Sequence, residues 1–208
     1  MTRIKICGLT NLADATAAQD HGAWALGFIF YPKSKRYITS ADAANIIPAL
    51  NAQCFGVFVN QTDEALQLAK TLPLAGLQLH GDETPDDCRK VRANFGGVFI
   101  KALRPKSKDD LAVIADYKGI VDYILLDAAA DGHYGGSGQT ADWALVQDAA
   151  SYGVPVILAG GLTPDNITAA AKSGAYALDL SSGVEAAPGR KDHDKLKALF
   201  SAVEGATP

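Results

Sequence analysis

Residues 154–183 read VPVILAGGLTPDNITAAAKSGAYALDLSSG, and this stretch decides the fold. An apolar run, Val156–Ala159, is followed by two glycines, an alanine-rich segment and a second apolar run, Ala177–Leu180. Strands of a parallel sheet are covered on both faces and therefore consist of such near-continuous apolar runs. The stretch predicts one strand–helix–strand unit with both strands pointing the same way.

The same alternation extends through the whole chain. Eight apolar runs are strand candidates: residues 4–7, 25–30, 55–59, 76–79, 98–102, 123–126, 156–159 and 177–180. Between them, Thr84 and Thr163 each precede a proline, which is typical of a helix that begins with a capping hydroxyl. Eight βα units without a linker predict an α/β fold, a single-domain (β/α)8 barrel over residues 1–208. A doubly wound open sheet is the alternative fold.

Composition excludes several classes of function. Hydrophobic residues make up 48% of the 208 residues and charged residues 20%, which is typical of a globular protein. The net charge is −4, and no long basic stripe suggests a nucleic-acid partner. The three cysteines have no metal-ligand spacing, so we expect no disulfide framework and no metal site. Without an apolar run near 18 residues or a signal-like start, we expect a cytoplasmic protein with no membrane partner.

Small residues follow the last two predicted strands. Gly160 and Gly161 come after the seventh strand, and Ser181, Ser182 and Gly183 come after the eighth. These loops are the usual position of a phosphate site in a barrel, because their backbone N–H groups favour an anion. We therefore expect a phosphate ester to bind there, although the glycines would also suit tight turns.

Two further strand ends carry groups that can transfer protons. Asp127 follows the sixth strand, where a carboxyl group can act as a general acid or base, or cap the next segment. Cys7 ends the first strand, and an isolated cysteine there is either a small core residue or a reactive thiol. Lys5 points to the same side of the strand as Cys7 and would favour the thiolate.

Other polar residues carry weaker signals. His80 ends the fourth strand, where it suits a hydrogen-bonding role, because the four histidines form no metal-ligand pattern. Arg36 follows the second strand and either grips a carboxylate or belongs to a solvated charged run. Residues 136–141 formally match GxGxxA, but they follow a long loop, so a dinucleotide site is not indicated. That loop, residues 128–140, suits a lid or an ordinary surface loop.

Taken together, these motifs resemble the phosphoribosylanthranilate isomerase family. The resemblance rests on segments in order along the chain: KICG at 5–8, GFIF at 27–30 with Ser34 and Arg36, GVFVN at 56–60, QLHG at 78–81, LLD at 125–127, GSG at 136–138, AGGL at 159–162 and SSGVE at 181–185, with PG at 188–189 and KD at 191–192. They cover the whole chain and fall at the predicted strand ends.

The resemblance implies an Amadori rearrangement of N-(5′-phosphoribosyl)anthranilate, a small-molecule substrate, with no cofactor. It assigns the general acid to Asp127 and the general base to Cys7. It assigns binding of the anthranilate carboxylate to Arg36, and binding of the phosphate to the loops that follow the seventh and eighth strands. We also place His80 among the substrate-binding residues.

One position departs from the family. Ala141 stands before Asp142 and Trp143 where the family commonly has phenylalanine, which leaves the packing of the preceding loop open. The alternative functions are another phosphate-binding barrel enzyme, such as a sugar-phosphate epimerase, and a non-catalytic phosphoribosyl-binding protein. The sequence leaves open whether the chain is a monomer or a homodimer.

Overall fold

The computed structural model describes residues 2–127 and 143–204. The predicted lid segment 128–140, the GxGxxA match and Ala141 lie outside the described residues. Eight parallel strands form a closed barrel in chain order, and β1 pairs with both β2 and β8. The strands are β1 (Arg3–Cys7), β2 (Ala25–Ile29), β3 (Gln53–Phe58), β4 (Gly76–Leu79), β5 (Val98–Leu103), β6 (Tyr123–Leu126), β7 (Val156–Ala159) and β8 (Ala177–Leu180). The closed barrel confirms the predicted fold, and every strand lies within two residues of its predicted bounds.

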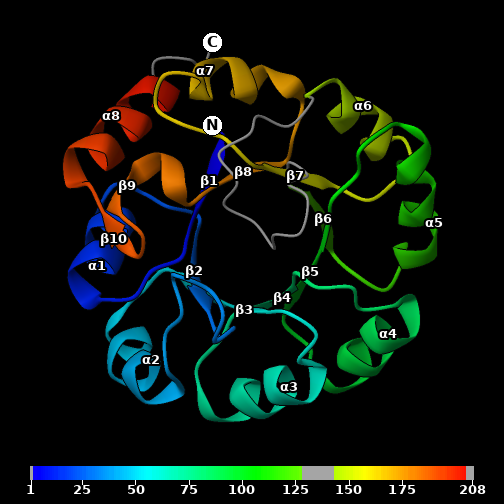
Figure 1. Ribbon diagram of the computed structural model, residues 1–208, viewed down its shortest axis with the longest axis horizontal. Helices are drawn as coiled ribbons and strands as arrows, with labels where there is room; N and C mark the ends of the chain where they lie inside the picture. The colour runs from blue at the N-terminus through cyan, green and yellow to red at the C-terminus, as the bar shows by residue number, and fades with distance from the viewer. Residues whose placement is uncertain (1, 128–142, 205–208) are drawn as a thin grey trace.

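A ring of helices surrounds the barrel (Figure 1). The α-helices are α1 (Leu12–Asp20), α2 (Ser40–Ile46), α3 (Thr62–Thr71), α4 (Pro85–Asn94), α5 (Ile114–Tyr117), α6 (Ala144–Ala150), α7 (Ile167–Ala170) and α8 (His193–Glu204). Short 3-10 helices are η1 (Ile47–Ala49), η2 (Asp109–Val113), η3 (Ala171–Ser173) and η4 (Ser182–Val184). A small hairpin of β9 (Glu185–Ala187) and β10 (Arg190–Lys191) follows β8. The ring closes where α8 lies next to α1 (Figure 1).

The two predicted helix starts have different outcomes. Thr84 caps α4 with its hydroxyl and forms a reciprocal capping box with Asp87. The prediction that Thr163 caps the next helix is wrong, because α7 begins only at Ile167. The side chain of Asn166 binds back to the N–H of Thr163 and to the carbonyl of Gly161, which makes a turn of the residues between.

The core has two layers, separated by the barrel wall. The larger layer lies between the strands and the helices and includes Ile4, Ile6, Leu77 and Leu178. The smaller layer fills the barrel interior with the side chains of Ala25, Phe55, Ile100, Ala102, Leu125, Ile157, Ala159 and Ala177. Because successive strand residues point to opposite faces, the residues between outer-layer positions point into the barrel. That alternation determines which polar side chains reach the site.

Candidate active site

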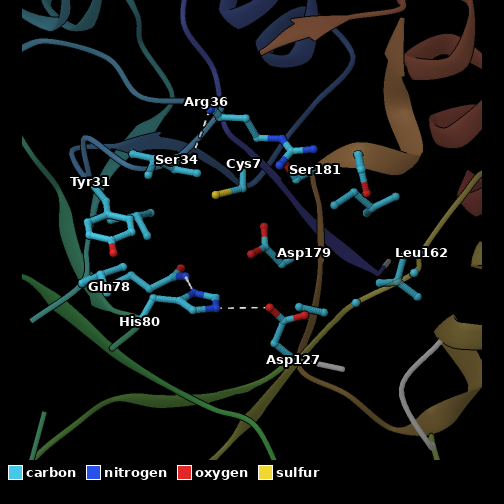
Figure 2. A pocket seen from close by; sticks show the side chains of 18 residues that line it. Cys7, Tyr31, Ser34, Arg36, Gln78, His80, Asp127, Leu162, Asp179 and Ser181 are labelled. Atoms are coloured by element: carbon cyan, nitrogen blue, oxygen red, sulfur yellow. Dashed lines mark hydrogen bonds and ion pairs between the residues drawn. The ribbon is translucent and has the colours of Figure 1, made fainter. Parts of the chain in front are cut away.

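A pocket opens at the carboxyl ends of the strands (Figure 2). The empty space in it, counted with the open mouth, is about 730 Å³. Most of the predicted site residues line it: Cys7, Arg36, His80, Asp127, Gly160, Gly161, Ser181 and Ser182. The structure therefore brings together residues from six different strand ends.

Three buried polar atoms in this pocket have no hydrogen-bond partner in the described part of the chain. They are Gln78 Oε1, Asp179 Oδ1 and Ser181 Oγ. Buried polar groups are nearly always paired, and leaving one unpaired costs roughly 1–3 kcal/mol. Their concentration in one pocket indicates that a polar ligand completes the hydrogen bonding.

Cys7 lies at the end of β1 and its thiol points into the pocket (Figure 2). Burial raises the pKa of this thiol, and the nearby ammonium groups of Lys5 and Lys191 act in the opposite direction. Thiolate is thus a minor form in the free protein and a strong base once formed.

A buried ion pair lies beside Cys7. The Nζ atom of Lys5 is 2.9 Å from Oδ2 of Asp179, its register partner on β8. Burial alone would lower the pKa of Lys5, but Asp179 and Cys7 outweigh burial and raise it. Burial also raises the pKa of Asp179, and the nearby Asp127 adds to that effect. The pocket thus holds a fixed positive charge next to the thiol.

Asp127 follows β6 and is 5% exposed. Its Oδ2 lies 3.1 Å from Nε2 of His80, and Nδ1 of His80 lies 2.8 Å from Nε2 of Gln78 (Figure 2). The structure therefore places His80 in contact with Asp127, which agrees with the hydrogen-bonding role that the sequence favoured.

Arg36 binds a carboxylate, but this carboxylate belongs to the chain itself. Its Nε and Nη2 each lie 2.7 Å from an oxygen of Glu185 in β9. Glu185 also accepts from Lys191, which is buried and donates to the carbonyls of Cys7 and Ser181. Burial would raise the pKa of Glu185, yet Arg36 and Lys191 hold it below its usual range. The bidentate contact fixes the guanidinium at the pocket wall, and no residue in 2–127 or 143–204 makes a hydrogen bond with its Nη1.

The two late loops form one side of the pocket. Gly160 and Gly161 have φ angles of 89° and 64°, a left-handed conformation that glycine adopts without strain. Gly183 does not itself line the pocket; a Cβ there would lie 1.8 Å from the carbonyl oxygen of Leu162. Gly183 therefore lets the β8 loop pack directly on the β7 loop, which brings Ser181 and Ser182 beside the glycines.

Three residues at the site have no role predicted from the sequence: Gln78, Asp179 and Glu185. For the first two there was a signal, because each interrupts an otherwise apolar strand of four residues. Glu185 depends on the β9–β10 hairpin, which returns it to Arg36 from 149 positions away in the sequence, and nothing local indicates that contact.

The described part of the chain has neither a metal-ligand cluster nor a membrane-spanning helix. No group of three or more His, Cys, Asp or Glu side chains in 2–127 and 143–204 is arranged to hold a metal ion. The helices in the same ranges are too short or too polar to span a bilayer.

Comparison with known proteins identifies the family. The family model for N-(5′-phosphoribosyl)anthranilate (PRA) isomerase matches residues 4–202. An N-(5′-phosphoribosyl)anthranilate isomerase of Trichlorobacter lovleyi is 45% identical over 204 residues, which cover 96% of this chain and 97% of the relative.

Two solved structures support the match. One, described as mutually generated monomers of the dimeric isomerase from Thermotoga maritima, is 38% identical, with a TM-score of 0.87 and coverage of 99% of this chain and 100% of that one. The other, a phosphoribosyl anthranilate isomerase in complex with reduced 1-(o-carboxyphenylamino)-1-deoxyribulose 5-phosphate, is 38% identical, with a TM-score of 0.86 and the same coverage. The chain belongs to the N-(5′-phosphoribosyl)anthranilate isomerase family.

Proposed function

We propose that the chain converts N-(5′-phosphoribosyl)anthranilate to 1-(2-carboxyphenylamino)-1-deoxyribulose 5-phosphate, with Asp127 as general acid and Cys7 as general base. The observation that carries the assignment is that a thiol and a carboxyl group project into one pocket from two separate places, the end of β1 and the residue after β6 (Figure 2). Family membership supports this reaction over a sugar-phosphate epimerase or a non-catalytic phosphoribosyl-binding protein.

The reaction consists of two proton transfers. Asp127 donates its proton to the ribose ring oxygen as the bond between that oxygen and C1′ breaks, which gives a protonated Schiff base. The Cys7 thiolate then takes the proton from C2′, and the electron pair of that bond moves to form an enolamine. Tautomerisation of the enolamine gives the ketone. General acid–base catalysis of this kind contributes about 10²–10⁴-fold to a rate for each group.

The pocket walls suit the two ends of the substrate. The backbone of Gly160 and Gly161, with Ser181 and Ser182, receives the phosphate, since small residues expose N–H groups and hydroxyls there. The Nη1 of Arg36 receives the anthranilate carboxylate, because Glu185 binds the Nε and Nη2 of the same guanidinium. The fixed guanidinium therefore orients the aromatic end.

The remaining expectations concern the chain as a whole. We infer that residues 1–208 work as one barrel domain in the cytoplasm, with no bound cofactor, as a monomer or a homodimer. The relative from Thermotoga maritima described as dimeric supports the homodimer.

The test follows the loss of phosphoribosylanthranilate fluorescence with purified protein. Asp127→Asn should lower kcat by about 10²–10⁴-fold, because the amide has no acidic proton to donate. This variant should still bind a reduced product analogue, since the walls that hold its ends are unchanged.

Asp82→Asn is the matched control, because Asp82 lies at the same end of the barrel and pairs with Arg104 outside the pocket. The control should keep near-normal kcat. Wild-type turnover by Asp127→Asn would remove the acid assignment, and an inactive wild-type protein would remove the proposed reaction.

A further inference from the structure

Gln78 is completely buried, yet its side chain points into the barrel toward the pocket (Figure 2). Its neighbours Leu77 and Leu79 pack in the outer layer, so strand alternation directs both Gln78 and His80 inward. Its amide Nε2 lies 2.8 Å from His80 Nδ1, and His80 Nε2 lies 3.1 Å from Asp127 Oδ2. A continuous hydrogen-bonded row thus connects a buried amide to the proposed general acid.

The direction of these hydrogen bonds follows from which end of the Gln78 amide faces His80. In this structure the amide nitrogen faces Nδ1. An amide nitrogen only donates, so in this arrangement Nδ1 accepts and the neutral ring carries its proton on Nε2. That proton is donated to Oδ2 of Asp127. If the ring were protonated on Nδ1 instead, the unprotonated Nε2 would face Oδ2 of Asp127. A hydrogen bond between these two atoms would then require a proton on Oδ2.

We propose that Gln78 is a positioning residue, whose amide holds His80 in the Nε2–H tautomer and thereby makes Oδ1 of Asp127 the oxygen that carries the catalytic proton. Once Oδ2 accepts from His80, the acidic proton of the carboxyl group belongs on Oδ1. No hydrogen bond to Oδ1 is made by any residue in 2–127 or 143–204, and Asp127 lines the pocket. Oδ1 is therefore the oxygen left to face the substrate. The inference rests on the proposed role of Asp127 as the acid.

The cost of keeping Gln78 in this position supports a functional role. Its Oε1 is buried and unpaired in the described part of the chain, which costs roughly 1–3 kcal/mol. An apolar side chain of similar size would avoid that cost in a strand that otherwise reads Gly76, Leu77 and Leu79. An amide donor to His80 is what the glutamine adds.

The first test reads the tautomer directly, without any variant. In wild-type protein labelled with ¹⁵N-histidine, NMR should show His80 with a protonated Nε2 and an unprotonated Nδ1. A His80 ring protonated on Nδ1 and not on Nε2 would overturn the proposal.

Two variants test the consequence for catalysis. Gln78→Glu replaces the donor by an acceptor, so His80 should move its proton to Nδ1, and kcat should fall at least about 10²-fold with little change in KM. Gln78→Met removes the donor and leaves the tautomer unspecified, so both NMR forms should be visible and kcat should fall less. If both variants keep the wild-type tautomer and kcat, Gln78 is not a positioning residue.

The control is Gln61→Met, because Gln61 Oε1 is also buried and unpaired among the residues described, but it lies outside the pocket. It should leave kcat and the His80 spectrum unchanged. The outcomes distinguish the two proposals. An active Asp127→Asn removes the acid role and with it the positioning role of Gln78, even if wild-type His80 carries Nε2–H. An inactive Asp127→Asn with Nδ1–H in wild type removes the role of Gln78 and leaves the acid role standing.

Discussion

Two clusters in this barrel have the same composition, a buried lysine, a carboxylate and a cysteine, and lie on opposite faces of the barrel wall. The interior cluster at the pocket consists of Lys5, Asp179 and Cys7, and the exterior cluster beneath α4 consists of Lys101, Glu83 and Cys88. The ion pairs are alike in length, 2.9 Å and 2.7 Å, and both lysines are at most 1% exposed. Ion-pair chemistry alone therefore does not distinguish them.

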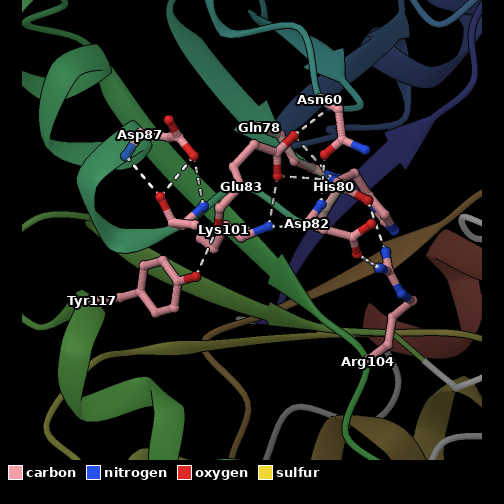
Figure 3. A network of polar contacts seen from close by, with 11 residues as sticks. Asn60, Gln78, His80, Asp82, Glu83, Asp87, Lys101, Arg104 and Tyr117 are labelled. Atoms are coloured by element: carbon pink, nitrogen blue, oxygen red, sulfur yellow. Dashed lines mark hydrogen bonds and ion pairs between the residues drawn. The ribbon is translucent and has the colours of Figure 1, made fainter.

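The clusters differ in how completely they are hydrogen bonded. Glu83 also accepts from the backbone N–H groups of Asn60 and Gly81, and Lys101 also donates to the carbonyl of Gly81 (Figure 3). In the interior cluster, by contrast, Oδ1 of Asp179 is buried with no partner in the described residues. Glu83 and Lys101 line a second cavity, but their charged atoms are hydrogen bonded within the described residues. The interior cluster, in contrast, leaves a buried carboxylate oxygen for a ligand.

Strand alternation explains why one cluster is open. Ile100 and Ala102 fill the barrel interior, so Lys101 between them points outward into the helix layer. Ile4 and Ile6 pack in the outer layer, so Lys5 points inward. The same residue types thus stabilise the fold on one face of the wall and form a site on the other.

The largest expected difference is between the two cysteines. Cys7→Ser should lower kcat by about 10²–10⁴-fold with little loss of stability, because the thiol is the proposed base. Cys88→Ser should keep kcat and lose about 1–3 kcal/mol of unfolding free energy, because its hydroxyl would be buried in an apolar layer. Equal kcat for the two variants, in the fluorescence assay, would place Cys7 in the core as well.

Substitution of each lysine by methionine should separate effects on the free energy of unfolding from effects on kcat. Lys101→Met should lower the unfolding free energy by about 3–5 kcal/mol, because it leaves Glu83 charged and buried without its partner. Lys5→Met should lose less stability, since Asp179 lines the pocket and its raised pKa lets it take up a proton.

Denaturant unfolding and the fluorescence assay measure both effects. Lys5→Met should lower kcat at neutral pH, because the Cys7 thiolate loses its neighbouring cation. The matched double variant Lys101→Met with Glu83→Gln should recover part of the lost stability. The comparison fails if Lys5→Met is the less stable variant and retains full kcat.

The smallest effect concerns thiol reactivity in the native protein. The pKa of Cys7 is raised above the ordinary 9.0, so its alkylation by iodoacetamide should increase steeply only above pH 9. Burial raises the pKa of Cys88 to about 12, and the residue is fully buried, so it should stay unmodified until the protein unfolds.

Mass spectrometry of the two peptides measures these rates. The reduced product analogue should protect Cys7, and Lys5→Met should move its alkylation to higher pH. Half-maximal modification of Cys7 below pH 9, or equal modification of Cys88 in folded protein, would contradict the difference between the clusters.

The local sequence pattern was sufficient to predict the barrel and part of the candidate active site. The strands at 76–79, 123–126, 156–159 and 177–180 were predicted to the residue, because parallel strands buried on both faces leave an unambiguous apolar run. Strand ends then pointed to Cys7, His80 and Asp127. The start of α7 was predicted wrongly, because the side chain of Asn166 competes locally with a cap at Thr163.

The sequence by itself determined the eightfold alternation, the end of the barrel where polar groups gather, and the presence of an acid, a thiol and two loops of small residues there. Only the tertiary structure decided which polar groups meet. The pairing of Lys5 with Asp179, the contact of Arg36 with Glu185 and the row from Gln78 to Asp127 join positions 174, 149 and 49 residues apart. Such contacts arise from closure of the sheet and from which way each strand residue points. The register of whole strands sets the first and the third, the β9–β10 hairpin sets the second, and no local propensity encodes any of them.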